Sequence, residues 1–226
     1  MDFDFSPLWL TARLASLTTL ILLLIGIPLA AWLAHRRSPL KPVIETLVSM
    51  PLVLPPSVLG FYLLLAFSPA DTFGGWLRDA LGIQLVFSFS GLVLGSVLFS
   101  MPFMVQPVAA ALNALPQSLR EASYTLGRSR WRTLLTVELP CVRAALAAGT
   151  VMSFAHTVGE FGLVLMLGGN IPGVTRLASI AVYDEVEALN YSAAHVYAAV
   201  LCGFSFTVVL AVNLLRRRAD AGGGVL

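Results

Sequence analysis

The chain has 226 residues, of which 58% are hydrophobic and 12% are charged, and its mean hydropathy is +0.85. In soluble domains about a quarter of the residues are charged. The composition therefore excludes an ordinary soluble domain and predicts an integral membrane protein. No nucleic-acid partner is expected, and the formal net charge of +2 says little about partners.

Five apolar runs are long enough for a helix to cross the hydrocarbon core of a membrane, which takes about 20 residues. They cover residues 14–34, 46–67, 89–110, 142–167 and 193–215. The first run follows Asp2 and Asp4 rather than a basic region, and it is longer than the core of a signal peptide, so it is predicted to remain as a span. The sequence thus predicts an all-α membrane protein with one transmembrane domain over residues 1–226.

The basic residues indicate the orientation, because positively charged loops stay in the cytoplasm. Eleven of the fourteen lie near the same predicted side: Arg36, Arg37, Lys41, Arg120, Arg128, Arg130, Arg132, Arg143, Arg216, Arg217 and Arg218. Only Arg13, Arg78 and Arg176 lie on the other side. The amino terminus is therefore predicted outside and the carboxy terminus inside, with a cytoplasmic loop over residues 113–140.

That loop contains the polar segment EASYTLGRSRWRTLLTVELP, which reads as two short helices. Ser118 and Glu121 have the spacing of a capping box, so a helix is predicted to begin near Ser118. Gly127 is suited to end it in the left-handed conformation. A second helix is predicted from about Ser129 to Pro140, where the backbone ladder breaks. The local features are compatible with a compact docking element and equally with a plain connector.

The same segment resembles the loop by which ABC transporter permeases contact their ATPase subunits. The family pattern is Glu-Ala-Ala, three residues, Gly, nine residues, Ile, one residue, Leu-Pro. The chain matches its spacing, with Ser123 replacing the second Ala and Val137 replacing Ile. The resemblance implies an ATPase-coupling role for Glu121, Ala122, Ser123, Gly127, Arg128, Arg130, Trp131 and Pro140.

The chain itself lacks the motifs of ATP hydrolysis and of metal catalysis. It has no Gly-x4-Gly-Lys-Ser/Thr phosphate loop, and its single lysine is Lys41. No His-Glu-x-x-His occurs, and Cys141 and Cys202 have no metal-site spacing and read as apolar packing residues. No catalytic residue, metal site or cofactor is therefore predicted, and ATP is expected to be bound by a separate subunit.

Ionisable groups lie deep in the fourth apolar run, where they are costly unless they face a protein interior or a water-filled path. The group consists of His156, Gly159, Glu160, Phe161 and Gly162. A carboxylate repels an anion, so Glu160 is interpreted as a structural or gating residue that accepts hydrogen bonds. His156 is the better pathway residue, with a neutral histidine bonded to a helix carbonyl as the alternative. The two glycines also fit ordinary helix packing.

The sequence GEFG followed by NIPGVTR resembles oxyanion-transporting permeases, most closely their molybdate branch, in which an arginine commonly replaces His156. On the outer side, Asn170, Pro172 and Gly173 are predicted to form a turn, and residues 175–183 a short surface or re-entrant segment. This region, with Arg176, could meet a substrate-delivery protein. Prolines at 51, 55 and 56 are predicted to interrupt the second span, and those at 102 and 107 the third.

The resemblance to five-span bacterial molybdate permeases implies a type I ABC importer permease in the inner membrane. It also implies a second copy of the chain, two ATPase subunits, an extracytoplasmic molybdate-binding protein and surrounding lipid. Tungstate and sulfate or thiosulfate permeases are the alternatives within the class. An ATP-independent channel or a membrane scaffold is the alternative from another class.

Overall fold

The computed structural model describes residues 4–36 and 38–222, with side chains through residue 214, and every regular element in these ranges is helical. Asp2, Arg37, the side chains of Arg216 to Arg218 and the end of the glycine-rich tail lie outside the described residues. The elements are α1 (Ser6–His35), α2 (Lys41–Ser49), η1 (Met50–Leu52), α3 (Pro56–Phe67), α4 (Thr72–Leu81), α5 (Phe89–Ala114), α6 (Gln117–Thr125), α7 (Arg130–Thr133), η2 (Leu134–Glu138), α8 (Leu139–Cys141), α9 (Arg143–Val158), α10 (Gly162–Gly168), α11 (Ala178–Glu187) and α12 (Tyr191–Gly222).

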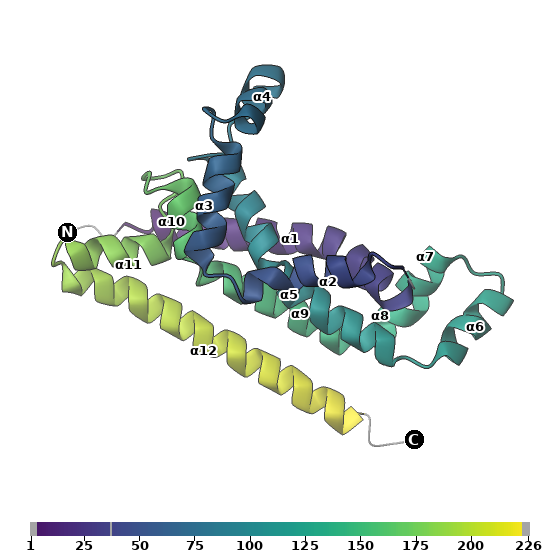
Figure 1. The fold of residues 1–226 in the computed structure, drawn as a ribbon. Helices are drawn as coiled ribbons and strands as arrows, with labels where there is room; N and C mark the ends of the chain where they lie inside the picture. The colour runs from purple at the N-terminus through teal and green to yellow at the C-terminus, as the bar shows by residue number, and fades with distance from the viewer. Residues whose placement is uncertain (1–3, 37, 223–226) are drawn as a thin grey trace.

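The core of the bundle is made by α1, α5 and α9, which pack on one another. Leu14 and Leu22 of α1 and Met104 and Leu112 of α5 are completely buried. Figure 1 shows an elongated bundle with the start of α1 and α11 at one end and α6 and α7 at the other, while α12 runs along the outside. The bundle therefore separates the predicted coupling loop from the predicted outer segment by its full length.

Within the part of the chain that the structure describes, three helices are long and apolar enough to cross a membrane: α1, α5 and residues 191–214 of α12. The number rises to five if each of two bent pairs counts as one span. One pair is Lys41–Leu52 with Pro56–Phe67, bent by 112°, and the other is Arg130–Cys141 with Arg143–Val158, bent by 84°. Length and composition thus agree with a multi-span chain.

The prolines act differently in the second and third predicted spans. The second is broken around Pro55, after a 3₁₀ turn at Met50–Leu52, as the sequence predicts. The prediction for the third is wrong, because α5 continues through Pro102 and Pro107 as one helix. Packing of α1 and α9 on this helix supports it where a backbone donor is missing.

The fourth predicted span, over residues 142–167, is not one helix. α9 ends at Val158 and α10 begins at Gly162, with an irregular link between them. The missed break coincides with the GEFG sequence. It takes residues 159–161 out of the helix, and these residues line the site described next.

Candidate functional site

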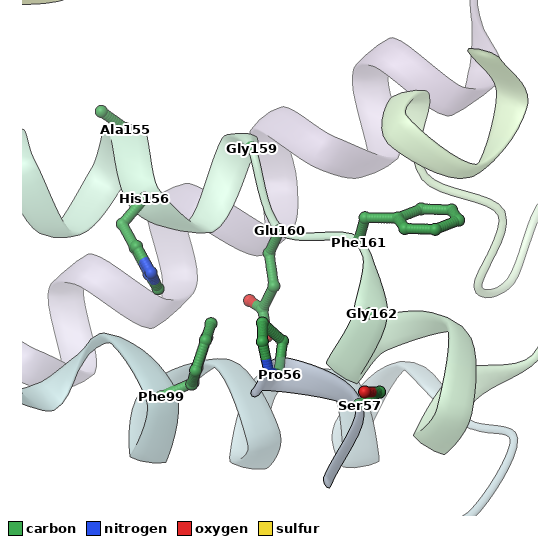
Figure 2. Close-up of a pocket in the computed structure, with 9 residues that line it drawn as sticks. All are labelled: Pro56, Ser57, Phe99, Ala155, His156, Gly159, Glu160, Phe161 and Gly162. Atoms are coloured by element: carbon green, nitrogen blue, oxygen red, sulfur yellow. The ribbon is translucent and has the colours of Figure 1, made fainter. Parts of the chain in front are cut away.

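A pocket of about 550 Å³ lies where two helix breaks face each other. It is lined by Pro56, Ser57, Phe99, Ala155, His156, Gly159, Glu160, Phe161 and Gly162. The first two residues begin α3, Phe99 belongs to α5, and the rest come from the α9–α10 region (Figure 2). All five residues predicted as pathway or gate candidates therefore line one pocket.

The two breaks are held together by close backbone contact. A Cβ added at Gly60 of α3 would lie 2.9 Å from Met166 Cβ and 3.0 Å from the Leu163 backbone of α10. A side chain there would push α3 and α10 apart. The glycine thus fixes the separation of the two short helices that flank the pocket.

Glu160 is held in the α9–α10 link by two neighbouring helices. Its side chain is buried, with the residue 3% exposed, and the Ser96 hydroxyl of α5 donates a hydrogen bond of 2.7 Å to Oε2. The Ser179 hydroxyl of α11 donates to the Glu160 backbone carbonyl at 2.6 Å. Figure 2 shows the carboxyl group directed toward Pro56, with the Phe161 ring directed away. Glu160 therefore ties the link to α5 and α11.

His156 ends a chain of hydrogen bonds that assigns its tautomer. Thr157 donates to the Ser153 carbonyl at 3.0 Å, so its hydroxyl oxygen is left to accept from Ser100 at 3.0 Å. The Ser100 oxygen then accepts from Nδ1–H of His156, also at 3.0 Å. Nε2 is the ring nitrogen left for a ligand, and it can donate to an anion only when the ring carries a second proton.

The loop between α5 and α9 contains a helical hairpin made of α6 and α7, and the turn between these helices lies where the sequence predicts it. Gly127 has φ of +76°; its N–H bonds to the Tyr124 carbonyl at 2.9 Å, and the N–H of Arg128 bonds to the Ser123 carbonyl at 3.2 Å. These two bonds form a Schellman motif, which satisfies carbonyls at the end of α6. Ser129 caps α7 by accepting from the Arg132 N–H.

The capping box predicted at the start of α6 is wrong. The helix begins at Gln117, its cap position is Pro116, and no side chain caps it. Ser118 lies one residue inside the helix, while Glu121 accepts a hydrogen bond of 2.8 Å from the Gln117 side chain. The extended backbone of Pro116 starts the helix too early for Ser118 to serve as its cap.

Inside the hairpin, Ser123 and Thr133 make a buried hydrogen bond of 2.9 Å between their hydroxyls. These residues are 5% and 0% exposed, and they belong to α6 and α7. Ser123 therefore joins the two helices of the hairpin and does not face outward. Position 123 is alanine in the family pattern, and the serine that replaces it here has a hydrogen-bond partner in Thr133.

The hairpin's outer surface combines apolar and basic side chains. Trp131 is 61% exposed and Leu126 is 79% exposed, while Arg128, Arg130 and Arg132 are also exposed. Glu121, Ala122 and Pro140 lie at the surface as well. Exposed aromatic groups among arginines are typical of a surface that binds another protein.

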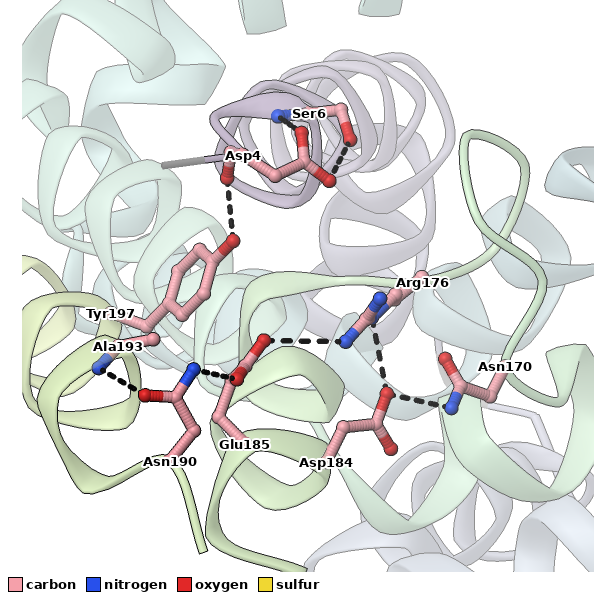
Figure 3. Close-up of polar contacts among 9 residues, drawn as sticks. All are labelled: Asp4, Ser6, Asn170, Arg176, Asp184, Glu185, Asn190, Ala193 and Tyr197. Carbon is pink, nitrogen blue, oxygen red and sulfur yellow. Dashed lines mark hydrogen bonds and ion pairs between the residues drawn. The ribbon is translucent and has the colours of Figure 1, made fainter. Parts of the chain in front are cut away.

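At the opposite end of the bundle, Arg176 lies between two carboxylates of α11. Its Nε is 3.1 Å from Asp184 Oδ2, and its Nη2 is 3.8 Å from Glu185 Oε1 (Figure 3). Asn170 and Asn190 donate to the same two carboxylates, at 2.7 and 2.8 Å. Arg176 thus fastens the loop before α11, and its charge is paired within the chain.

The predicted turn in this loop is present over Pro172–Thr175, with Gly173 at φ of +73°. Residues 178–187, within and beyond the predicted surface segment, form α11. Nearby, the Tyr197 hydroxyl of α12 donates to the Asp4 carbonyl, which ties the start of the chain to the last helix. Hydrogen bonds from the side chain and backbone of Ser6 hold the pKa of Asp4 below its usual range.

Residues 26–221 match the family described as binding-protein-dependent transport system inner membrane component. The chain belongs to this family. The permease is 46% identical over 217 residues to the molybdenum transport system permease protein ModB of Azotobacter vinelandii, covering 96% of each chain. It is 36% identical to ModB of Escherichia coli (strain K12), covering 82% and 81%. To the sulfate transport system permease protein CysT of that strain it is 32% identical, covering 84% and 69%.

Two solved ABC transporters share the permease's fold. One is a bacterial alginate transporter in complex with a periplasmic protein, at TM-score 0.77 and 17% identity over 97% of this chain and 80% of that chain. The other is the methionine transporter MetNI, at TM-score 0.70 and 17% identity over 93% and 94%. The predicted all-α ABC importer fold is therefore confirmed, and the chain is a membrane transport subunit, not an enzyme.

Several residues that position the site were missed in the sequence analysis. Ser96 and Ser100 lie four residues apart in an apolar helix, which places both hydroxyls on one face, toward Glu160 and His156. That spacing was the available signal. Glu138 was also missed, although it is a carboxylate in the otherwise apolar sequence LLTVELP.

Proposed function

We propose that this permease is the membrane subunit of an ATP-driven importer that carries molybdate across the bacterial inner membrane. The observation that supports this most strongly is its 46% identity, over 96% of both chains, to a permease named for molybdenum transport. The 32% identity to a sulfate permease supports a second function, sulfate import, on lower similarity and coverage.

The two ends of the bundle fit two different partners in this proposal. The exposed apolar and arginine side chains around Trp131 receive one of two ATPase subunits, and the Arg176 end meets an extracytoplasmic binding protein. The amino terminus then faces outward and the hairpin faces the cytoplasm, in agreement with the distribution of basic residues. ATP is bound by the ATPase, and this chain needs no cofactor.

A second copy of the chain completes the pathway. Several side chains of α12 point away from the bundle, including Phe206 at 71% and Val209 at 55% exposure. Such apolar surface suits lipid or another copy of the permease. The binding protein selects the oxyanion before delivery, so the pathway needs only a weak site for it.

Within the pathway, His156 is the residue that contacts the oxyanion. Its Nδ1 donates to Ser100, and an entering dianion favours protonation of the ring, which would then present Nε2–H and one positive charge to the pocket. A permanently charged arginine in this place would act in the same sense. Glu160 has a structural role, because its carboxyl group is bonded to Ser96 and would repel a dianion if ionised.

The division of roles is tested with Glu160→Gln and Ser96→Ala, which alter the same hydrogen bond from its two sides. Both variants should change complex yield or the basal ATPase rate and leave the relative rates for molybdate and sulfate unchanged. A shift in substrate preference in Glu160→Gln alone would instead place this carboxyl group in contact with the substrate.

The function as a whole is tested by reconstituting the permease with its ATPase and adding binding protein loaded in turn with molybdate, tungstate or sulfate. Molybdate-loaded protein should stimulate ATP hydrolysis most. Stimulation by sulfate-loaded protein alone would favour the second function. A permease that conducts oxyanions without the ATPase would be a channel.

A further inference from the structure

Glu138 is a buried carboxylate at the junction between the hairpin and the transmembrane core. Its side chain is 2% exposed, and Oε1 lies 3.1 Å from Nε2 of His35 and 3.6 Å from Nε of Arg120. His35 is the last residue of α1, and Arg120 belongs to α6. One carboxylate oxygen thus faces a core helix and a hairpin helix together.

A charge in such a place is costly unless it is paired, because the carboxylate loses its hydration on burial. The flanking side chains are themselves only 25% (His35) and 20% (Arg120) exposed, and Arg120 is the permanently charged one of the two. Separating α6 from α1 would therefore leave Glu138 with one partner fewer. The electrostatic energy of the cluster resists relative movement of these two helices.

The local backbone also marks this position. Glu138 ends η2, a π-helical turn in which the N–H of Leu139 bonds to the Leu134 carbonyl. Such turns occur mostly as single interruptions of helices and are frequent at functional sites. η2 packs on α6, α7 and α8, while α1 packs on α5 and α9. Glu138 therefore lies where the hairpin meets the helices that form the core.

We propose that Glu138 is a positioning residue that couples movement of the hairpin to α1, with Arg120 as its contact on the hairpin and His35 as its contact on the core. This inference rests on the proposed function, in which an ATPase moves the hairpin. The exposed surface around Trp131 binds the ATPase, and the Glu138 cluster passes the displacement onward. Binding and transmission are thus assigned to different residues of one loop.

The test measures molybdate transported per ATP hydrolysed in proteoliposomes that contain the whole transporter and its binding protein. Glu138→Gln should retain the ATPase and hydrolyse ATP, but the ratio should fall by about threefold or more, the scale expected for a side chain on a coupling route. Arg120→Gln should do the same, and the double variant should be no worse than either single variant. The matched control is Glu45→Gln, which removes the carboxylate of an exposed ion pair with Lys41 on α2.

A chemical link separates transmission from general stability. In a background without Cys141 and Cys202, His35→Cys with Arg120→Cys removes both contacts of Glu138 and should lower the ratio, and joining the two thiols with a short bismaleimide should restore it. Should Glu138→Gln fail to assemble, the partly exposed Arg120→Gln decides the question. A normal ratio in Arg120→Gln, or no recovery on cross-linking, would overturn the inference. Absence of ATP-dependent uptake by the wild-type complex would overturn the proposed function itself.

Discussion

Gly127→Val perturbs the hairpin turn without filling any occupied space. The glycine has φ of +76°, and a Cβ built on it meets no atom within 4 Å among the described residues. The substitution therefore adds no clash, and its cost comes from the backbone. The left-handed conformation costs a residue with a side chain roughly 1–2 kcal/mol, and a β-branched residue is among the least suited to it.

This cost is enough to change the arrangement of the hairpin. An energy of about 1–2 kcal/mol corresponds to roughly a five- to thirtyfold change in the balance between two conformations. The share of molecules that lack the Schellman bonds of Gly127 and Arg128 should rise by that factor, and in these molecules α7 should leave its position beside α6. Since the turn lies outside the predicted spans, membrane insertion should be unaffected.

The assay is the amount of ATPase subunit that copurifies with the permease, together with ATP hydrolysis stimulated by loaded binding protein. Both should fall several-fold in Gly127→Val. Gly127→Asn should retain nearly normal values, because asparagine tolerates the left-handed conformation.

Gly82→Val is the matched control at a distant turn. Gly82 ends α4 with φ of +66° and equally open surroundings, so the substitution carries a similar backbone cost. It should leave ATPase retention unchanged. Normal copurification and transport by Gly127→Val would refute the docking argument and reduce the hairpin to a connector. Equal losses of ATPase retention in Gly127→Val and Gly82→Val would show that general destabilisation causes the effect.

Three further predictions concern orientation, the pathway and the hairpin. In a cysteine-free background, an impermeant thiol reagent should label Thr72→Cys in intact cells and Ser129→Cys only after lysis. Both positions are exposed, so the reverse labelling pattern would show that the topology is inverted. His156→Ala should cut molybdate uptake about tenfold, the value of one hydrogen bond to a charged group, while His156→Arg should transport molybdate at the normal rate. Normal uptake by the alanine variant would show that His156 only packs within the protein. Ser123→Ala should destabilise the purified permease by about 1–3 kcal/mol in thermal unfolding, because it leaves the buried Thr133 hydroxyl unpaired. Adding Thr133→Val should recover most of this stability, and additive losses from the two substitutions would contradict the pairing.

The features predicted correctly are those fixed by neighbouring residues. Gly127 closes α6 because glycine adopts the left-handed conformation without steric cost, and Pro55 breaks the second span because proline removes a backbone donor. The capping box failed for an equally local reason, since Pro116 already occupied the cap position. Two local signals for the start of α6, the capping-box spacing and the proline before it, pointed to different residues, and the sequence analysis considered only the first.

The remaining features depend on contacts between distant segments. The bonds from Ser96 and Ser179 to Glu160, and the meeting of His35, Arg120 and Glu138, require the packed arrangement of α1, α5, α6 and α11. Apolar periodicity carries little information about such pairs in a membrane protein, because lipid-facing and core-facing positions are both apolar. The break between α9 and α10 was hidden for the same reason.

The most direct test is ATP-dependent release of labelled molybdate from proteoliposomes that contain the permease, its ATPase and the molybdate-loaded binding protein. With the ATPase facing outward, binding protein enclosed in the lumen and ATP added outside, molybdate should leave the vesicles, and without ATP it should remain. Release that does not depend on ATP, or none when ATP is hydrolysed, would contradict the assignment of this chain as the pathway of an ATP-driven molybdate importer.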